Sequence, residues 1–119
     1  MKKYRNDFYN SVIINNKFDE DIFLSISNDL ISYLDLDAYV YSIDMINSIK
    51  PYNADGFIHN NKIFIKRDNS NFVDIYNYYN KLFVVLFHEL RHAMQYKMID
   101  EYNTQFHFLS SKYKFNEEE

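Results

Sequence analysis

Cysteine is absent from this chain of 119 residues, and proline and glycine occur once each, as Pro51 and Gly56. The lack of cysteine excludes a disulfide framework, a cysteine-ligated zinc finger and a thiol nucleophile. The scarcity of glycine and proline leaves no linker that would divide the chain, and the sequence contains no internal repeat. We therefore expect residues 1–119 to form a single domain.

Positive charge and long apolar runs are also scarce. The 13 lysines and arginines are outnumbered by 17 acidic residues and are scattered, so direct nucleic-acid binding is not expected. The longest apolar runs, such as Leu82–Phe87, fall far short of the ~20 residues that span a bilayer. The N-terminal residues contain no apolar segment of the kind that a signal peptide requires. We expect a cytoplasmic protein that does not enter a membrane.

Apolar residues make up 47% of the chain, and their spacing predicts an α+β fold. Asp19–Leu34 opens with acidic residues, and its apolar residues then recur every three to four positions, which predicts a helix. Ala38–Ile46 alternates and is rich in tyrosine, valine and isoleucine, which predicts a strand. Phe57–His59 and Ile63–Ile65 flank an asparagine-rich turn, which predicts a β-hairpin.

The last third of the chain is expected to be helical. Phe72–Met98 has a helical pattern that weakens near Asn80, where the helix could break. A turn near Met98–Tyr102 would then lead into a second helix over Asn103–Lys114. The expected architecture is a small antiparallel sheet with a hairpin, packed on the long helix, and a C-terminal helix.

The residues His88-Glu89-Leu90-Arg91-His92 match the pattern H-E-x-x-H. Residues four apart lie on the same face of a helix, so both imidazoles can bind one metal ion. Glu89 lies next to the first histidine and can accept a proton from a metal-bound water molecule. This pattern is the strongest functional signal in the sequence. It predicts a Zn²⁺ site with His88 and His92 as ligands and Glu89 as the catalytic base.

A helical projection of this segment separates two faces. Val85, His88, Glu89, His92 and Tyr96 fall on one side, and Phe83, Phe87, Leu90 and Met94 fall about 180° away. We therefore expect the apolar face to pack into the domain. The run Leu82–Phe87 is apolar all round, so we expect the helix to begin in the core and the two histidines to lie in a pocket of low dielectric constant.

The segment Leu86–Gln95 resembles the active-site helix of small zincin metallopeptidases, particularly the ImmA/IrrE-like and SprT-like groups of bacteria and mobile elements. The resemblance implies a minimal zincin-like domain in which His88 and His92 bind zinc and Glu89 is the general base. It also implies a protein or peptide substrate. The hairpin strand Ile63–Ile65 would then be the sheet edge that holds the substrate as an added strand.

A catalytic zinc ion usually has a third protein ligand, and three residues are candidates. If the chain turns near Met98–Tyr102 and returns antiparallel, His107 comes level with His92, and this makes His107 the first choice. Glu119 is the second choice, because ImmA/IrrE-like peptidases place a glutamate on a helix beyond the motif. Glu101 is the third choice, although it lies so close to the expected turn that it would have difficulty reaching the metal.

Three functions stay open at this point. The first is a zinc-dependent peptidase that hydrolyses a peptide bond in a protein partner. The second is a zincin-like interaction protein, such as one encoded by a phage, that binds metal without turnover. The third is a structural helical protein in which the motif occurs by chance. His59, in the expected hairpin, either lines the cleft or is structural.

Overall fold

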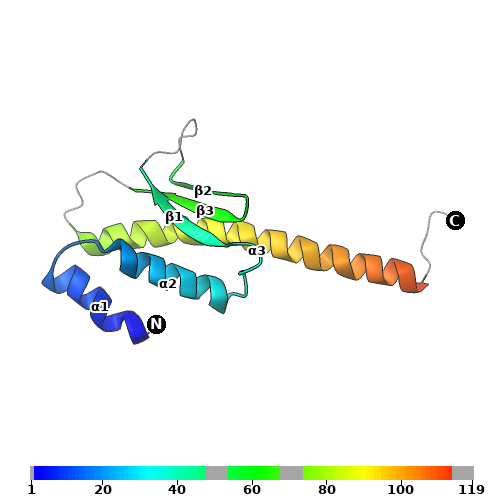
Figure 1. The fold of residues 1–119 in the computed structure, drawn as a ribbon, viewed down its shortest axis with the longest axis horizontal. Coiled ribbons are helices and arrows are strands. Elements are labelled where there is room, and N and C mark those ends of the chain that lie inside the picture. The colour runs from blue at the N-terminus through cyan, green and yellow to red at the C-terminus, as the bar shows by residue number, and fades with distance from the viewer. Residues whose placement is uncertain (1, 48–53, 68–73, 114–119) are drawn as a thin grey trace.

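The computed structural model describes residues 2–47, 54–67 and 74–113. These residues form an α+β fold in two layers, with a three-stranded sheet on one side and two helices, α2 and α3, on the other (Figure 1). In chain order the elements are η1 (Lys2–Tyr4), α1 (Arg5–Tyr9), η2 (Asn10–Ile14), α2 (Glu20–Tyr33), β1 (Ser42–Ile46), β2 (Gly56–His59), β3 (Lys62–Lys66) and α3 (Ile75–Tyr113).

The expected helix over Asp19–Leu34 is confirmed as α2. Asp19 is its N-cap, and the Asp19 carboxylate accepts a hydrogen bond of 2.9 Å from the backbone N–H of Asp21. Acidic side chains in the first turn also interact favourably with the helix dipole. Glu20 adds a tertiary contact, because it pairs with Arg67 just beyond β3 through two guanidinium nitrogens. The start of α2 is thus fixed to one end of the sheet.

The sheet is mixed, so the expected antiparallel sheet is wrong. The strand order is β1-β3-β2, with β1 parallel to β3 and β2 antiparallel to β3. β3 is therefore the central strand, and the expectation that Ile63–Ile65 forms the sheet edge is also wrong. The physical reason is burial: Ile63 and Ile65 are fully buried, whereas no residue of β2 is. The strand with the most apolar inward face takes the centre, and β2 is an edge.

The predicted hairpin between β2 and β3 is confirmed. Asn60 and Asn61 connect the strands and have φ angles of 51° and 63°. Both residues thus adopt the left-handed conformation that a tight hairpin turn requires, and asparagine tolerates this conformation better than most residues. The hairpin register pairs Gly56 with Ile65 and Ile58 with Ile63, so Gly56 and Ile58 share the face of the sheet that looks toward α3.

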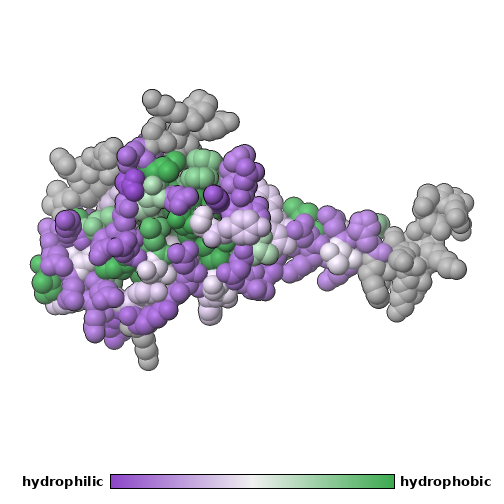
Figure 2. Space-filling view, in the orientation of Figure 1, coloured by the Kyte–Doolittle hydropathy of each residue, from purple (hydrophilic) through white to green (hydrophobic). Residues whose placement is uncertain are grey.

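Helix α3 is a single continuous helix of 39 residues. The expected break near Asn80 and the expected turn near Met98–Tyr102 are both wrong. The sequence of α3 contains neither glycine nor proline, so it lacks the residues that most often end a helix. Beyond the sheet α3 projects from the body (Figure 1), and Figure 2 shows mostly hydrophilic side chains along this part. None of the described helices combines the length and the apolar character needed to cross a membrane.

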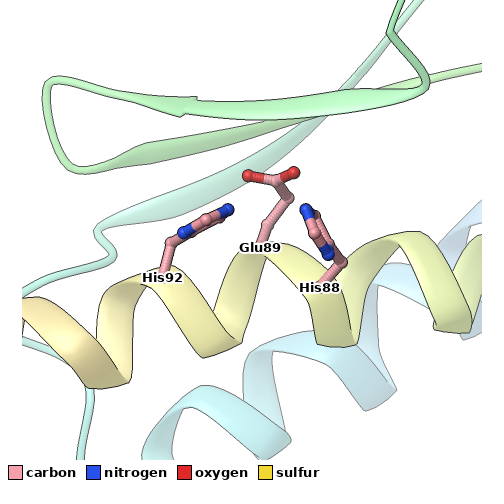
Figure 3. Close-up of side chains that lie close together, drawn as sticks. All are labelled: His88, Glu89 and His92. Carbon is pink, nitrogen blue, oxygen red and sulfur yellow. The ribbon is translucent and has the colours of Figure 1, made fainter.

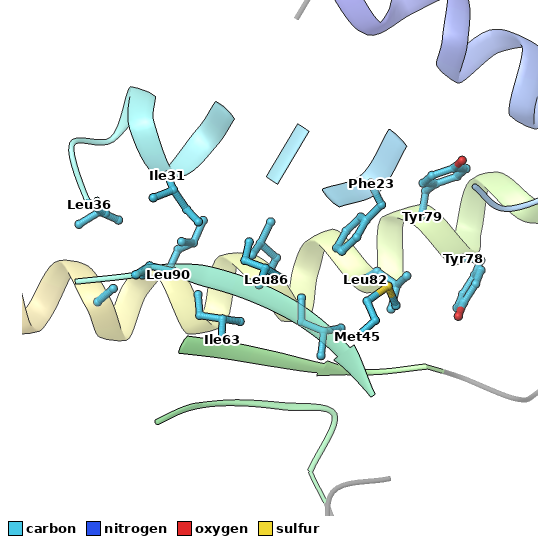
Figure 4. Close-up of a cluster of buried hydrophobic side chains, with 14 residues drawn as sticks. Phe23, Ile31, Leu36, Met45, Ile63, Tyr78, Tyr79, Leu82, Leu86 and Leu90 are labelled. Carbon is cyan, nitrogen blue, oxygen red and sulfur yellow. The ribbon is translucent and has the colours of Figure 1, made fainter. Parts of the chain in front are cut away.

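The buried stripe of α3 differs from the expected one. It contains Leu82, Leu86, Leu90 and Ala93, which pack with Ile63 and other sheet residues and with Phe23 and Ile31 of α2 (Figure 4). By contrast, Phe87 is 52% exposed and Met94 is 43% exposed, although we expected both in the core. The helical projection correctly predicted that the helix is amphipathic. The face that the sheet and α2 cover is, however, rotated from the expected face toward Glu89. The rotation brings the Glu89 side chain under the sheet.

Gly56 allows β2 to approach α3 closely. A Cβ atom at this position would lie 2.6 Å from Val85 Cγ1 and 3.1 Å from the carbonyl oxygen of Phe64. We expect Gly56→Ala to destabilise the protein by about 1–3 kcal/mol, the usual cost of overpacking. Urea denaturation would measure this cost, and Val85→Ala is the matched control because it removes Cγ1. An equal cost in the wild-type and Val85→Ala backgrounds would contradict the proposed contact.

Candidate metal centre

His88 and His92 lie one turn apart on α3, as the motif predicts. Their ring centroids are 4.9 Å apart and their planes are nearly perpendicular. His88 is exposed and His92 is half-buried, so the expectation that both lie in a pocket of low dielectric constant is wrong for His88. The rotated packing of α3 explains this difference, because it leaves the histidines at the border of the buried stripe. An open border position gives a metal ion and a substrate direct access from solvent.

Glu89 is the buried member of the group, with only 5% of its surface exposed. Its carboxylate extends toward the strands of the sheet and lies next to the rings of His88 and His92 (Figure 3). Glu89 Cγ is 3.6 Å from where a Cβ of Gly56 would be, so β2 covers this side chain directly. Burial raises the pKa of Glu89, while the two histidines act in the opposite direction and lower it. The covering strand therefore produces a carboxyl group of increased basicity beside two potential metal ligands.

The three side chains can converge on one metal ion. One ligand atom from each of His88, Glu89 and His92 lies within 4.8 Å of the others. A tetrahedral zinc ion with bonds of 2.0–2.1 Å needs donors roughly 3.4 Å apart, so small side-chain rotations suffice. Two neutral imidazoles and a nearby carboxylate are also the donor types that zinc prefers. The residue types and the spacing of their ligand atoms are therefore compatible with a zinc ion.

The third ligand expected from the sequence is not brought to this group. His107 lies on the same continuous helix and is exposed, about 22 Å along the axis from His92. The reason is that α3 does not turn, so the helical hairpin that would return His107 does not form. Glu101 is likewise about 14 Å along the axis from His92. Glu119, the remaining candidate, lies outside the described residues. Within the described residues, the possible metal-binding group consists of His88, Glu89 and His92.

No protein family model, curated protein or solved structure matches this chain. A metal centre is therefore supported by the spacing of the motif and by the geometry of the three side chains. The histidine spacing follows from helix periodicity, whereas the position of β2 above Glu89 follows from the tertiary fold.

One residue of the site was missed in the sequence. Gly56 faces α3 from β2 and covers Glu89 at the sheet edge. One signal for Gly56 was available, because the chain has a single glycine and this glycine begins a strand, where a close backbone approach is a common reason for glycine. His59 is the last residue of β2 and is exposed, and it is not part of the metal-binding group.

Glu89→Gln is expected to stabilise the metal-free protein at pH 7 by roughly 1–2 kcal/mol, because glutamine removes a buried charge. Burial raises the pKa of Glu89 above its usual range, so the folded chain binds this proton more tightly than the unfolded chain does. Protonated Glu89 therefore contributes to the stability of the folded protein. This contribution is fully present below the pKa that Glu89 has in the unfolded chain, and it is lost as the pH rises through the pKa that Glu89 has in the folded chain.

Urea denaturation of the wild type and of Glu89→Gln over a range of pH values tests this expectation. The difference between the two proteins should be small in acid, where the carboxyl group is neutral in both states, and should grow toward neutral pH. A Glu89→Gln variant that is less stable than the metal-free wild type at pH 7 would contradict the assignment of Glu89 as a desolvated carboxyl group.

Proposed function

We propose that this chain is a zinc-dependent peptidase of zincin type. In this proposal His88 and His92 hold the zinc ion, and Glu89 is the general base for hydrolysis of a peptide bond. One observation carries the proposal: a buried carboxylate lies next to two imidazoles of the same helix, beneath the edge strand of a sheet. A chance pair of surface histidines would not be accompanied by a desolvated acid and a strand edge.

The zinc ion would supply Lewis-acid chemistry, which polarises the carbonyl of the scissile bond and makes a nearby water molecule more acidic. Glu89 accepts the proton from the attacking water at its carboxylate and returns it to the nitrogen of the leaving amine. A carboxyl group that both takes and gives a proton works best when its pKa is closer to the operating pH. The burial of Glu89 moves its pKa in this direction.

The edge strand β2 supports a peptide as the substrate. Among the described strands β2 pairs with β3 on one side only, and its inward face passes over Val85 and Glu89 at Gly56. Its other edge therefore offers backbone N–H and C=O groups on the side of α3 that carries the histidines. An extended peptide can bind there as an additional strand, with main-chain hydrogen bonds for affinity. This position aligns the peptide backbone with the metal-binding group.

Cleavage of a complex protein mixture tests the proposal. The zinc-loaded protein would be incubated with denatured proteins, and new peptide termini would be identified by mass spectrometry. We expect new termini that disappear with a chelator and return when zinc is restored. Stoichiometric zinc binding without new termini would overturn the proposed peptidase activity.

That result would favour a metal-binding interaction protein as the second candidate. The projecting part of α3 supports this alternative, because it exposes Met98, Ile99, Tyr102 and Phe106 without a covering element among the described residues. Exposed apolar residues of this kind are common at sites where proteins bind partners. The interaction protein would keep the zinc ion as a structural or recognition element.

A further inference from the structure

A pocket of about 580 Å³ lies beyond the metal-binding group, toward the turn of the β2–β3 hairpin. Its walls come from three separate parts of the chain. Tyr39 lies in the connection between α2 and β1, Ile58 and Asn61 lie in the hairpin, and Tyr96 and Asp100 lie on α3. The peptidase chemistry described above uses none of these side chains, so the pocket is separate from the group formed by His88, Glu89 and His92.

The pocket lies at a distance from the histidines that suits one side chain of a bound peptide. Tyr96 and Asp100 follow His92 by one and two turns of α3, so Asp100 is about 12 Å along the helix axis. An extended peptide advances about 3.3 Å per residue, and it therefore reaches Asp100 within about four residues. Because β2 passes from Gly56 above Glu89 to Ile58 at the pocket, a peptide paired with β2 follows this path.

The lining of the pocket favours a positive charge. Asp100 is its acidic residue, and the lining contains one histidine, His59, but neither lysine nor arginine. The carboxylate of Asp100 beside Tyr39 raises the pKa of the Tyr39 hydroxyl. The nearest cation on α3, Lys97, is engaged elsewhere, because its Nζ lies 3.2 Å from the carboxylate of Asp35. Asp100 thus lies at the pocket wall, and Lys97 is paired with Asp35 instead of with Asp100.

The other lining groups complement a guanidinium or ammonium group. The side-chain carbonyl of Asn61 and the hydroxyl of Tyr96 can accept hydrogen bonds from such a group, and an aromatic ring attracts a nearby cation. A carboxylate can accept two parallel hydrogen bonds from arginine. Ile58 contributes an apolar wall that can contact the methylene groups of a long basic side chain.

We propose that this pocket is a specificity site for a basic residue of the substrate, about four residues from the cleaved bond. The proposal rests on the proposed peptidase function, because it assumes that the peptide is added to β2. It narrows the substrate class to extended segments with an arginine or lysine at a fixed distance from the bond that faces His88 and His92.

Peptide binding to the metal-free protein tests the pocket without requiring cleavage. The probes are two short peptides that differ only in one residue, arginine or its neutral analogue citrulline, and binding is followed by NMR. We expect the arginine peptide to bind about fivefold more tightly and to shift the resonances of Tyr39 and Tyr96. Asp100→Asn should bind both peptides equally, whereas Glu101→Gln is the matched control and should keep the preference.

Equal binding of the two peptides to the wild type would overturn the specificity site, and so would an unchanged preference in Asp100→Asn. These outcomes are separate from failure of the peptidase. If the preference is present but no peptide is cleaved by the zinc-loaded protein, the pocket is supported and the peptidase activity is not. If peptides are cleaved without regard to a basic residue, the peptidase is supported and the specificity site is refuted.

Discussion

Glu89→Gln should reduce peptide cleavage by a factor of about 10²–10⁴ while zinc stays bound, the range typical for the loss of a general base. Glutamine has nearly the same shape as glutamate but cannot accept the proton of the attacking water. His88 and His92 lie on the same helix face as before, so the metal should be retained. Cleavage rates would be compared with zinc content, measured on the same samples by elemental analysis.

Glu101→Gln is the control for this experiment. It makes the same chemical change on α3, at an exposed residue about two and a half turns beyond His92. Its cleavage rate and zinc content should equal those of the wild type. If Glu89→Gln kept full activity, Glu89 would not be the base. If Glu89→Gln lost zinc, the carboxylate would be a metal ligand, and another group would have to accept the proton.

His88→Ala and His92→Ala should each abolish zinc binding, because either change leaves a single imidazole at the site. The loss can be measured as stability. Zinc at a hundred times its dissociation constant should stabilise the wild type by about 2.7 kcal/mol, and this gain should be absent in both variants. Thermal unfolding with zinc and with a chelator measures the difference.

The His107→Ala variant distinguishes between a continuous helix α3 and the turn expected from the sequence, which would bring His107 to the metal. The continuous helix α3 puts His107 about 22 Å along its axis from His92, so this variant should bind zinc as the wild type does. Loss of zinc in His107→Ala would mean that α3 bends back, or that His107 reaches the metal from a second copy of the chain.

The local elements of the fold could be predicted from the sequence, and these include the β2–β3 hairpin. The pairing of β1 with β3 could not. Helix α2 and the hairpin turn at Asn60 and Asn61 are encoded by capping, periodicity and turn residues that lie close together in the chain. The parallel pairing of β1 with β3 depends on contacts between distant segments, and the alternation of each strand is compatible with either neighbour.

The continuity of α3 could also have been predicted from the sequence. Its sequence contains neither glycine nor proline after Ile75, yet a turn was expected near Met98–Tyr102. Polar residues alone do not end a helix in water, because a projecting helix can carry them on every face. The choice of His107 as the third ligand depended on this expected turn, and it fails because the turn does not form.

The metal-binding group itself was predicted because it depends on a single helix. The spacing of His88 and His92 places them together whatever surrounds the helix. The burial of Glu89 and the exposure of His88 depend on which face the sheet covers, and helix periodicity fixes that face only approximately. Gly56 belongs to the site through tertiary packing alone.

The same turns of α3 carry both the core and the candidate metal centre. Leu86 and Leu90 are buried, while His88 between them is exposed and His92, two residues after Leu90, is half-buried. Consequently the backbone amides of the metal-binding turn can exchange with solvent hydrogen only when the core opens, whereas the projecting end can fray by itself. The backbone that carries the histidine pair is therefore part of the most cooperative unit of the fold.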